Sequence, residues 1–156
     1  MKNLQTQRGI SLLEVLITVA VIGILTAVIA YSFISFKNTQ LLSVARDQVV
    51  SIVIKAKSET LASKNSMSYG VHFENIKVVL FTGPTYSATA VDNQVYVFDS
   101  KVSMSSIVLT GGGNEILFDR LTGFVTQNGN VIVSLISDTS KQKSITISKT
   151  GIIAYN

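Results

Sequence analysis

The chain has 156 residues, enough for one compact domain with an appendage but too few for two ordinary domains. It is 47% hydrophobic and 14% charged, and its net charge of +4 includes Lys2 and Arg8 near the N-terminus, so charge is only weak support for a nucleic-acid partner. The absence of cysteine excludes disulfides, thiolate metal sites and thiol catalysis.

The N-terminal region contains an apolar run from Val15 to Phe36, 22 residues without a charge. As a helix it would reach about 33 Å, enough to cross a hydrocarbon core of about 30 Å. A cleavable secretory signal has a shorter apolar core of about 7–15 residues. The run therefore predicts a single membrane span. Lys2 and Arg8 precede it, so the positive-inside rule predicts residues 1–9 in the cytoplasm and the C-terminal part outside.

Glu14 interrupts the start of this apolar segment. A charge at the centre of a membrane helix costs about 2.5–3.5 kcal/mol, so a carboxylate there is tolerated only with a partner or with water. Two explanations stay open. Glu14 pairs with a cation, or it lies near the interface of a plain membrane anchor and is hydrated there.

The polar leader ending in Arg8-Gly9, followed by Ile10 and Glu14, resembles the type III leader of type IV pilins and type II secretion pseudopilins. In that family a membrane prepilin peptidase cuts after the glycine and methylates the new N-terminus. The resemblance implies cleavage between Gly9 and Ile10 and N-methylation of Ile10, which stands where the family usually has Phe. Glu14 is then the fifth residue of the mature chain. Its counterpart in the family neutralises the N-terminus of a neighbouring subunit, and the amine created by cleavage is mostly cationic at neutral pH.

The region after the span continues as a helix. An apolar stripe with spacings of three and four predicts an amphipathic helix with one side against a core, and its members are Leu42, Ala45, Val49, Ile52, Val53 and Ala56. No helix breaker stands between Gly23 and Asn65. We therefore expect one long helix over about residues 10–64.

The remaining residues have the composition of short strands separated by turns. The predicted strands are Ser68–Phe73, Lys77–Thr82, Gln94–Asp99, Ser106–Thr110, Glu115–Phe118, Gly123–Thr126, Val131–Ile136, Ser144–Ser148 and Ile152–Tyr155. The predicted turns are Gly83-Pro84, Gly111-Gly112-Gly113, Asn128-Gly129-Asn130 and Lys149-Thr150-Gly151. Several strands after one helix predict an α+β fold in which an antiparallel sheet packs on the helix.

The end of the helix with the first strand (AKSETLASKNSMSYGVHF) and the closing strands (ILFDRLTGFVTQNGNVIVSL and ITISKTGIIAY) resemble the GspH/FimT minor pilins and pseudopilins. Residues 80–114 resemble nothing in particular. The resemblance implies a type IV pilin-like fold of three parts. These are a leader peptide at residues 1–9, a transmembrane and filament-core helix at 10–36, and a globular head at 37–156 that includes the amphipathic helix 37–65.

Catalytic and metal sites find little support in the sequence. His72 is the only histidine, which excludes a multi-histidine metal site, and in its alternating strand it is expected to be half-buried or exposed. Gly111-Gly112-Gly113 lacks the Lys-Ser/Thr of a phosphate loop and is expected to form a flexible connection. Asp119-Arg120 is expected to be a turn with a local ion pair rather than a catalytic dyad. We expect neither enzymatic activity nor a cofactor.

The resemblance implies a structural subunit, a minor pilin or pseudopilin, of a type IV pilus or a type II secretion pseudopilus. Its implied partners are other pilin subunits, the prepilin peptidase, the inner-membrane assembly platform and membrane lipid before assembly. The implied location is the inner membrane, with the head outside the cytoplasm, and then a periplasmic or cell-surface filament.

Two alternatives remain. One is a DNA-uptake pilin of FimT type, although Gly151 is followed by Ile152, Ile153 and Ala154 instead of the basic motif of such proteins. Lys141, Lys143 and Lys149 supply nearby cations, but lysines that protect an exposed sheet edge explain them equally well. The other is a permanently anchored extracytoplasmic binding module.

Overall fold

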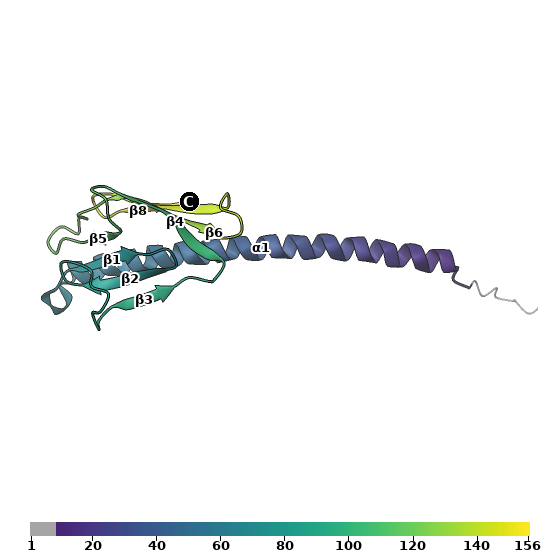
Figure 1. Ribbon diagram of the computed structural model, residues 1–156, viewed down its shortest axis with the longest axis horizontal. Helices are drawn as coiled ribbons and strands as arrows, with labels where there is room; N and C mark the ends of the chain where they lie inside the picture. Colours follow the sequence, from purple (N-terminus) through teal and green to yellow (C-terminus); the bar gives the residue numbers. More distant parts are fainter. Residues whose placement is uncertain (1–8) are drawn as a thin grey trace, which may run out of the picture. The chain divides into compact units, whose positions relative to one another are not determined.

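A computed structural model describes residues 9–156 of the chain (Figure 1). The chain divides into two compact units with the boundary between Lys37 and Asn38, and we call the second unit, Asn38–Asn156, the head. Helix α1 spans Leu12–Leu61 and contributes to both units. Its first part is described with the candidate site below.

The part of α1 that lies in the head presents an apolar stripe to the core. All six predicted members of the stripe are buried, and each is at most 3% exposed. Val50 and Thr60 are buried beside them. The spacing of three and four residues thus identified the buried face of the helix correctly, because side chains at that spacing lie on one side of an α-helix.

Helix α1 ends three residues before the predicted position. Ser63 has a φ of 48° and Asn65 a φ of 52°, which are left-handed conformations that cannot continue a right-handed helix. A short 3-10 helix, Lys64–Ser66, leads from there into the first strand. The residue types gave no warning of this, because neither glycine nor proline stands at the helix end.

Two antiparallel four-stranded sheets make up the rest of the head. Sheet A has the order β3-β2-β1-β5, with bounds Gln94–Val97, Lys77–Thr82, Tyr69–Phe73 and Glu115–Leu117. Sheet B has the order β4-β6-β7-β8, with bounds Val102–Leu109, Gly129–Leu135, Gln142–Ile147 and Ile153–Tyr155. The fold is therefore α+β, as predicted, with one long helix packed against antiparallel sheets (Figure 1). The single sheet that we expected is in fact two.

Some strand predictions were wrong. Gly123–Thr126 forms no strand, since Gly123 has a φ of 68° and only Val125 makes a bridge, to Phe118. Strand β4 begins four residues before the predicted Ser106, and its register shifts between Met104 and Ser106 at a β-bulge. The predicted turn at Asn128–Asn130 is also misplaced, because Gly129 and Asn130 already belong to β6.

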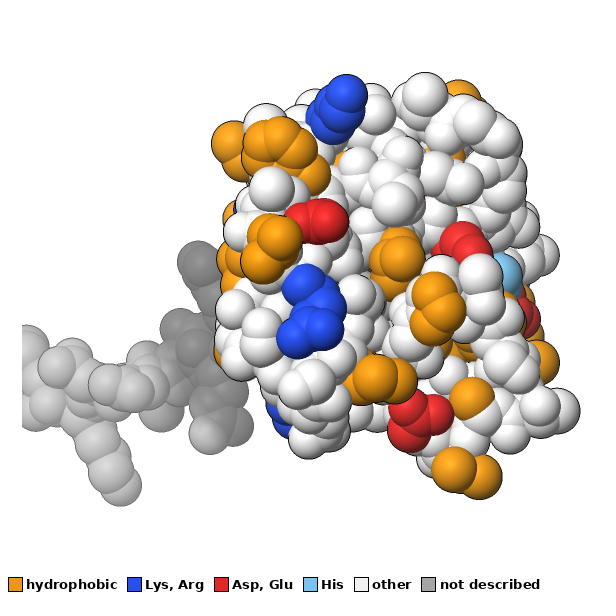
Figure 2. Space-filling model, turned by 90° about the vertical axis from the view of Figure 1, so that its left-hand side faces the viewer, with side chains coloured by type: hydrophobic (Ala, Val, Ile, Leu, Met, Phe, Trp, Pro, Cys, Tyr) orange, Lys and Arg blue, Asp and Glu red, His pale blue; other side chains and the backbone are white. Residues whose placement is uncertain are grey.

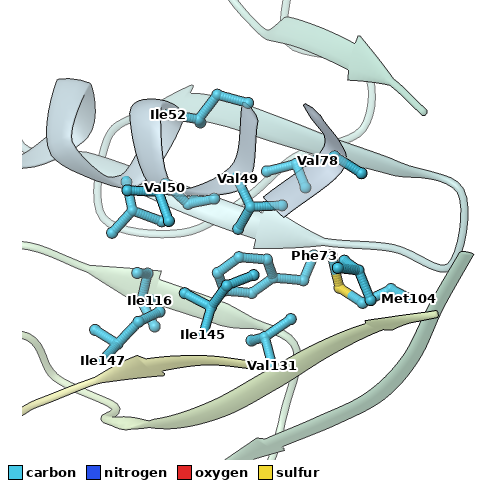
Figure 3. Packing of buried hydrophobic residues seen from close by; sticks show 14 of the residues in the cluster. Val49, Val50, Ile52, Phe73, Val78, Met104, Ile116, Val131, Ile145 and Ile147 are labelled. Carbon is cyan, nitrogen blue, oxygen red and sulfur yellow. The ribbon is translucent and has the colours of Figure 1, made fainter. Parts of the chain in front are cut away.

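The core lies between α1, sheet A and sheet B. Figure 3 shows Val49 and Val50 of the helix facing Phe73 and Ile116 of sheet A, with side chains of β6 and β7 on the other side of that layer. Phe73, Ile116, Val131 and Ile145 are fully buried. The three elements therefore share one main core.

Polar side chains of α1 attach the helix to both sheets. The Lys55 ammonium donates to Gln94 Oε1 at 2.7 Å, at strand β3. Tyr69 N donates to the buried Thr60 hydroxyl at 2.9 Å, at the start of β1. The Lys57 ammonium donates to the carbonyls of Thr150 and Gly151, at 3.1 and 3.0 Å, in the turn before β8. These bonds fix the helix relative to strands from both sheets.

Gly70 in β1 is required by close packing. A Cβ atom there would lie 2.3 Å from Phe81 Cζ and 2.6 Å from the Ile116 carbonyl oxygen, both below normal contact distance. The Phe81 ring therefore lies directly over the glycine backbone, between β1 and β2.

Candidate functional site: the N-terminal apolar helix

The candidate assembly site is the exposed segment from Gly9 to the boundary of the head. Gly9 and Ile10 precede the helix, and Ile10 is 76% exposed. Open space surrounds Gly9, because no atom lies within 4 Å of where its Cβ would be. The Gly9–Ile10 peptide bond thus lies in an exposed segment outside the helix. Residues 1–8, which include Lys2, Arg8 and the rest of the predicted leader, lie outside the described residues.

Ser11 caps the N-terminus of α1. Its hydroxyl accepts a hydrogen bond from Leu13 N at 3.3 Å, which satisfies one of the amides that a helix leaves without a partner. Ser11-Leu12-Leu13-Glu14 has the Ser-x-x-Glu pattern of a capping box. The sequence analysis missed this role of Ser11, although this pattern before an apolar run would have revealed it.

Glu14 lies in the first turn of α1, where a negative charge is favoured by the helix dipole. Within residues 9–156 its carboxylate has neither a hydrogen-bond nor an ion-pair partner. The helix dipole stabilises this carboxylate by about 0.3–1 kcal/mol, which is less than the free-energy cost of placing a charge in a membrane interior. Glu14 is therefore a charge that the described part of a single chain leaves uncompensated.

The hydroxyl side chains in the apolar segment have partners within the helix. Thr18, Thr26 and Ser32 each donate to a backbone carbonyl three or four residues earlier, at 2.8–3.0 Å. In a hydrocarbon environment such internal bonds remove the cost of a free polar group. This contrasts with Glu14, whose oxygens have no such partner among the described residues.

The apolar side chains of this segment are uncovered. Every leucine, isoleucine, valine and phenylalanine from Leu12 to Phe36 is exposed in the single chain. By length and composition α1 is able to cross a membrane. A surface of this size is stable only against lipid or against other apolar helices.

The other residues singled out in the sequence have structural roles. His72 is half-buried, as predicted, with 19% of its side chain exposed. Gly111, Gly112 and Gly113 all have positive φ in the connection between β4 and β5. Within residues 9–156 no group of three or more His, Asp or Glu side chains is arranged to hold a metal ion.

Asp119 forms a turn, but the predicted ion pair with Arg120 is absent from the described chain. Its Oδ1 instead accepts hydrogen bonds from Leu121 N, Thr122 N and the Thr122 hydroxyl, at 2.9, 2.9 and 3.0 Å. The bond from the Thr122 amide, followed by that from the Leu121 amide, lowers the pKa of Asp119 below its usual value. The turn is held by the backbone and needs no cation.

The three C-terminal lysines, Lys141, Lys143 and Lys149, do not form a cluster. Lys141 precedes β7 and Lys149 follows it, so the two lie at opposite ends of a strand that is about 20 Å long. Strand β8 pairs with β7 along Ile145–Ile147 and is the outermost strand of sheet B there. The lysines of β7 and its ends therefore do not line a single sheet edge. Figure 2 shows basic side chains lying apart on one face of the head, with acidic, hydrophobic and uncharged side chains between them.

Comparison with known proteins gave one match. Residues 4–30 match the prokaryotic N-terminal methylation motif, which covers Gly9, Ile10, Glu14 and most of the apolar segment. No curated protein and no solved structure matched the chain. A type IV pilin motif indicates a structural subunit that interacts with other pilins and with a prepilin peptidase, and the apolar helix supports membrane anchoring. The motif, the long N-terminal helix and the antiparallel head together support a type IV pilin-like subunit.

Proposed function

We propose that this chain is the precursor of a minor pilin or pseudopilin of the GspH/FimT type. Prepilin peptidase cuts between Gly9 and Ile10 and methylates the Ile10 amine. The mature subunit spans the inner membrane once, with its head outside the cytoplasm. The assembly platform then transfers it into a pilus or a secretion pseudopilus.

One observation carries the proposal: an uncompensated carboxylate at the start of an uncovered apolar helix, within a methylation motif. Packing against the helices of neighbouring subunits replaces lipid around residues 10–36. Cleavage creates an ammonium group at Ile10, and Glu14 pairs with that group of a neighbour. A charge pair in an apolar setting is stable only when both partners are in place, so Glu14 marks the correct register between subunits.

The first experiment is the intact mass of the protein recovered from membranes of a strain with its native prepilin peptidase. We expect the mass of residues 10–156, with or without one methyl group. A mass that retains residues 1–9 would contradict the proposal and favour a permanently anchored binding module.

The second experiment measures incorporation into sheared filaments by immunoblot. Glu14→Gln keeps the shape of the side chain and removes its charge, so we expect incorporation to fall at least tenfold while the membrane level is kept. Asp47→Asn removes an exposed carboxylate from the head part of the same helix and is the matched control, expected to assemble normally. Normal assembly of Glu14→Gln would show that Glu14 has no pairing role.

The DNA-uptake alternative receives less support. Binding driven by phosphate needs several cations on one face, and Lys141 and Lys149 lie at opposite ends of β7. We therefore assign the chain to the structural class of pilins in preference to the DNA-binding class.

A further inference from the structure

The connection between β2 and β3, residues 83–93, lies over the outer face of sheet A, and we call it the cover loop. In β2, Val78 and Leu80 enter the main core, so Val79 and Phe81 point to the other face, where both are nevertheless buried. Tyr86 of the cover loop contacts the Phe81 ring edge to face, with ring centres 5.8 Å apart. The same tyrosine stacks on His72 of β1, at 3.9 Å and 13° between the ring planes.

The His72 imidazole lies between two carboxylates. Its Nδ1 is 3.7 Å from Glu115 Oε2, and its Nε2 is 4.0 Å from Glu74 Oε1. Nδ1 is buried and has no hydrogen-bond partner in the described part of the chain. This nitrogen therefore faces a carboxylate at a distance too long for a hydrogen bond.

The same two carboxylates hold the cover loop. Tyr86 N donates to Glu115 Oε2 and the Tyr86 hydroxyl donates to Glu74 Oε1, both at 3.4 Å. These bonds are long, and Glu74 Oε2 also binds the Lys77 ammonium of β2 at 3.2 Å. His72, its two acidic neighbours and the cover loop thus form one connected cluster.

A metal ion does not explain this cluster. An ion binds one imidazole nitrogen at a time, whereas Glu74 and Glu115 face opposite nitrogens of the ring. The two carboxylates therefore have no position from which both could join His72 around a single ion.

We propose that His72 is a proton switch that fastens the cover loop to sheet A under mildly acidic conditions. Protonation makes both ring nitrogens donors, one toward each carboxylate, and places a cation against the Tyr86 ring. Histidine is the side chain whose charge ordinarily changes between about pH 5 and 8, so this is the range in which such a switch is tested. The charged and titratable groups that face the imidazole are Glu74 beyond β1, Glu115 of β5 and Tyr86 of the cover loop. Lys77 of β2 acts on Glu74.

The switch controls an apolar surface. When the cover loop opens, Tyr86 leaves Phe81, and the outer face of sheet A becomes accessible at Phe81 and Val79. This inference concerns only head residues, so it is independent of the cleavage and assembly proposed above.

The test is amide hydrogen exchange of the full chain in detergent micelles, followed by mass spectrometry at pH 5.5 and pH 7.5. The measured quantity is the protection of the amides in residues 84–92 against exchange, corrected for intrinsic exchange rates. We divide it by the protection of β6, which is the internal reference. We expect this ratio to be about threefold to tenfold higher at pH 5.5, the range that one or two partly exposed ion pairs supply. An equal ratio at the two pH values in the wild-type chain would overturn the proposal.

Variants locate the effect at His72. His72→Gln removes the titrating ring, and His72→Phe keeps an aromatic ring to stack on Tyr86, so we expect both to show the same ratio at both pH values. Asp138→Asn removes a carboxylate outside the cluster that is ionised at both pH values, because the hydrogen bond from the Ser140 hydroxyl lowers the pKa of Asp138, and this variant should keep the wild-type increase. An increase that persists in both His72 variants would assign the pH effect to other groups and would also overturn the proposal.

Discussion

Asp119 shows how an exposed carboxylate holds a turn without an ionic partner. Its side chain accepts hydrogen bonds from two backbone amides and a hydroxyl, whereas the sequence suggested an ion pair with the neighbouring Arg120. The residue pattern Asp-Arg suggested a charge pair, because sequence shows charges more readily than it shows free backbone donors. The position of the turn was predictable, whereas the partner was not.

We predict that Asp119→Ala destabilises the head at neutral pH because three hydrogen bonds are lost. The folded pKa of Asp119 is lowered, so the ionised form stabilises the fold. This stabilisation is fully present above the unfolded pKa of about 3.9 and is lost as pH falls through the lower folded value. The urea midpoints of variant and wild type should therefore differ at pH 7, and the difference should shrink as the pH is lowered from 4 to 2.5. A constant difference between them would contradict the role of the charge.

Ser11 and Glu14 lie at the start of α1, where the sequence analysis overlooked the helix-capping role of Ser11. Attention to the charge of Glu14 concealed the Ser-x-x-Glu pattern that it forms with Ser11. Only the Ser11 half of a capping box is made within residues 9–156, where the Ser11 hydroxyl accepts from Leu13 N and the Glu14 carboxylate has no hydrogen-bond partner. The two roles of Glu14 are compatible. A carboxylate in the first turn favours the helix start in the single chain, and it retains an oxygen for a neighbour's ammonium group.

At the scale of elements, helix α1 was the most predictable part of the molecule. Its stripe of small and branched apolar residues repeats over four turns, and a repeat of that length has few alternative explanations. The strands are shorter and depend on distant partners. Ser103, Ser105 and Ser106 in β4 are polar, and a bulge interrupts the alternation of burial, so the first half of this strand could not be recognised.

Ile52 and Ile54 offer a matched test of the helix orientation. Ile52 is 3% exposed, whereas Ile54, two residues later on the other side of the helix, is 54% exposed. We expect Ile52→Ala to lower the free energy of unfolding by about 2–5 kcal/mol, because it leaves a cavity in the core. Ile54→Ala should change it by no more than about 0.5 kcal/mol. Chemical denaturation of the two variants measures both values, and similar losses would show that the buried face is misassigned.

At the scale of the whole head, the two sheets are interleaved along the chain. Strand β5 of sheet A lies in sequence between β4 and β6 of sheet B, so the chain crosses between the sheets repeatedly. Sequence patterns showed that strands exist but not this pairing, because each strand's apolar side chains would suit either sheet. The two-sheet arrangement depends on packing around the shared helix.

We predict that the two sheets unfold together. Ile145 in β7 is fully buried and belongs to the core that α1 and both sheets share. Ile145→Ala should lower the free energy of unfolding by about 2–5 kcal/mol. Hydrogen exchange through global opening should accelerate equally in β1 and β6. Acceleration confined to sheet B would mean that each sheet is a separate cooperative unit.

The order of elements along the chain also affects how the head is synthesised. The apolar stripe of α1 is complete at Ala56, but Ile145 and Ile147 of β7, which complete the core that the stripe belongs to, are translated roughly 90 residues later, about 5–20 s at ordinary synthesis rates. During that interval the stripe is part of an unfinished core. Slow translation between β1 and β7 is therefore expected to favour aggregation over folding.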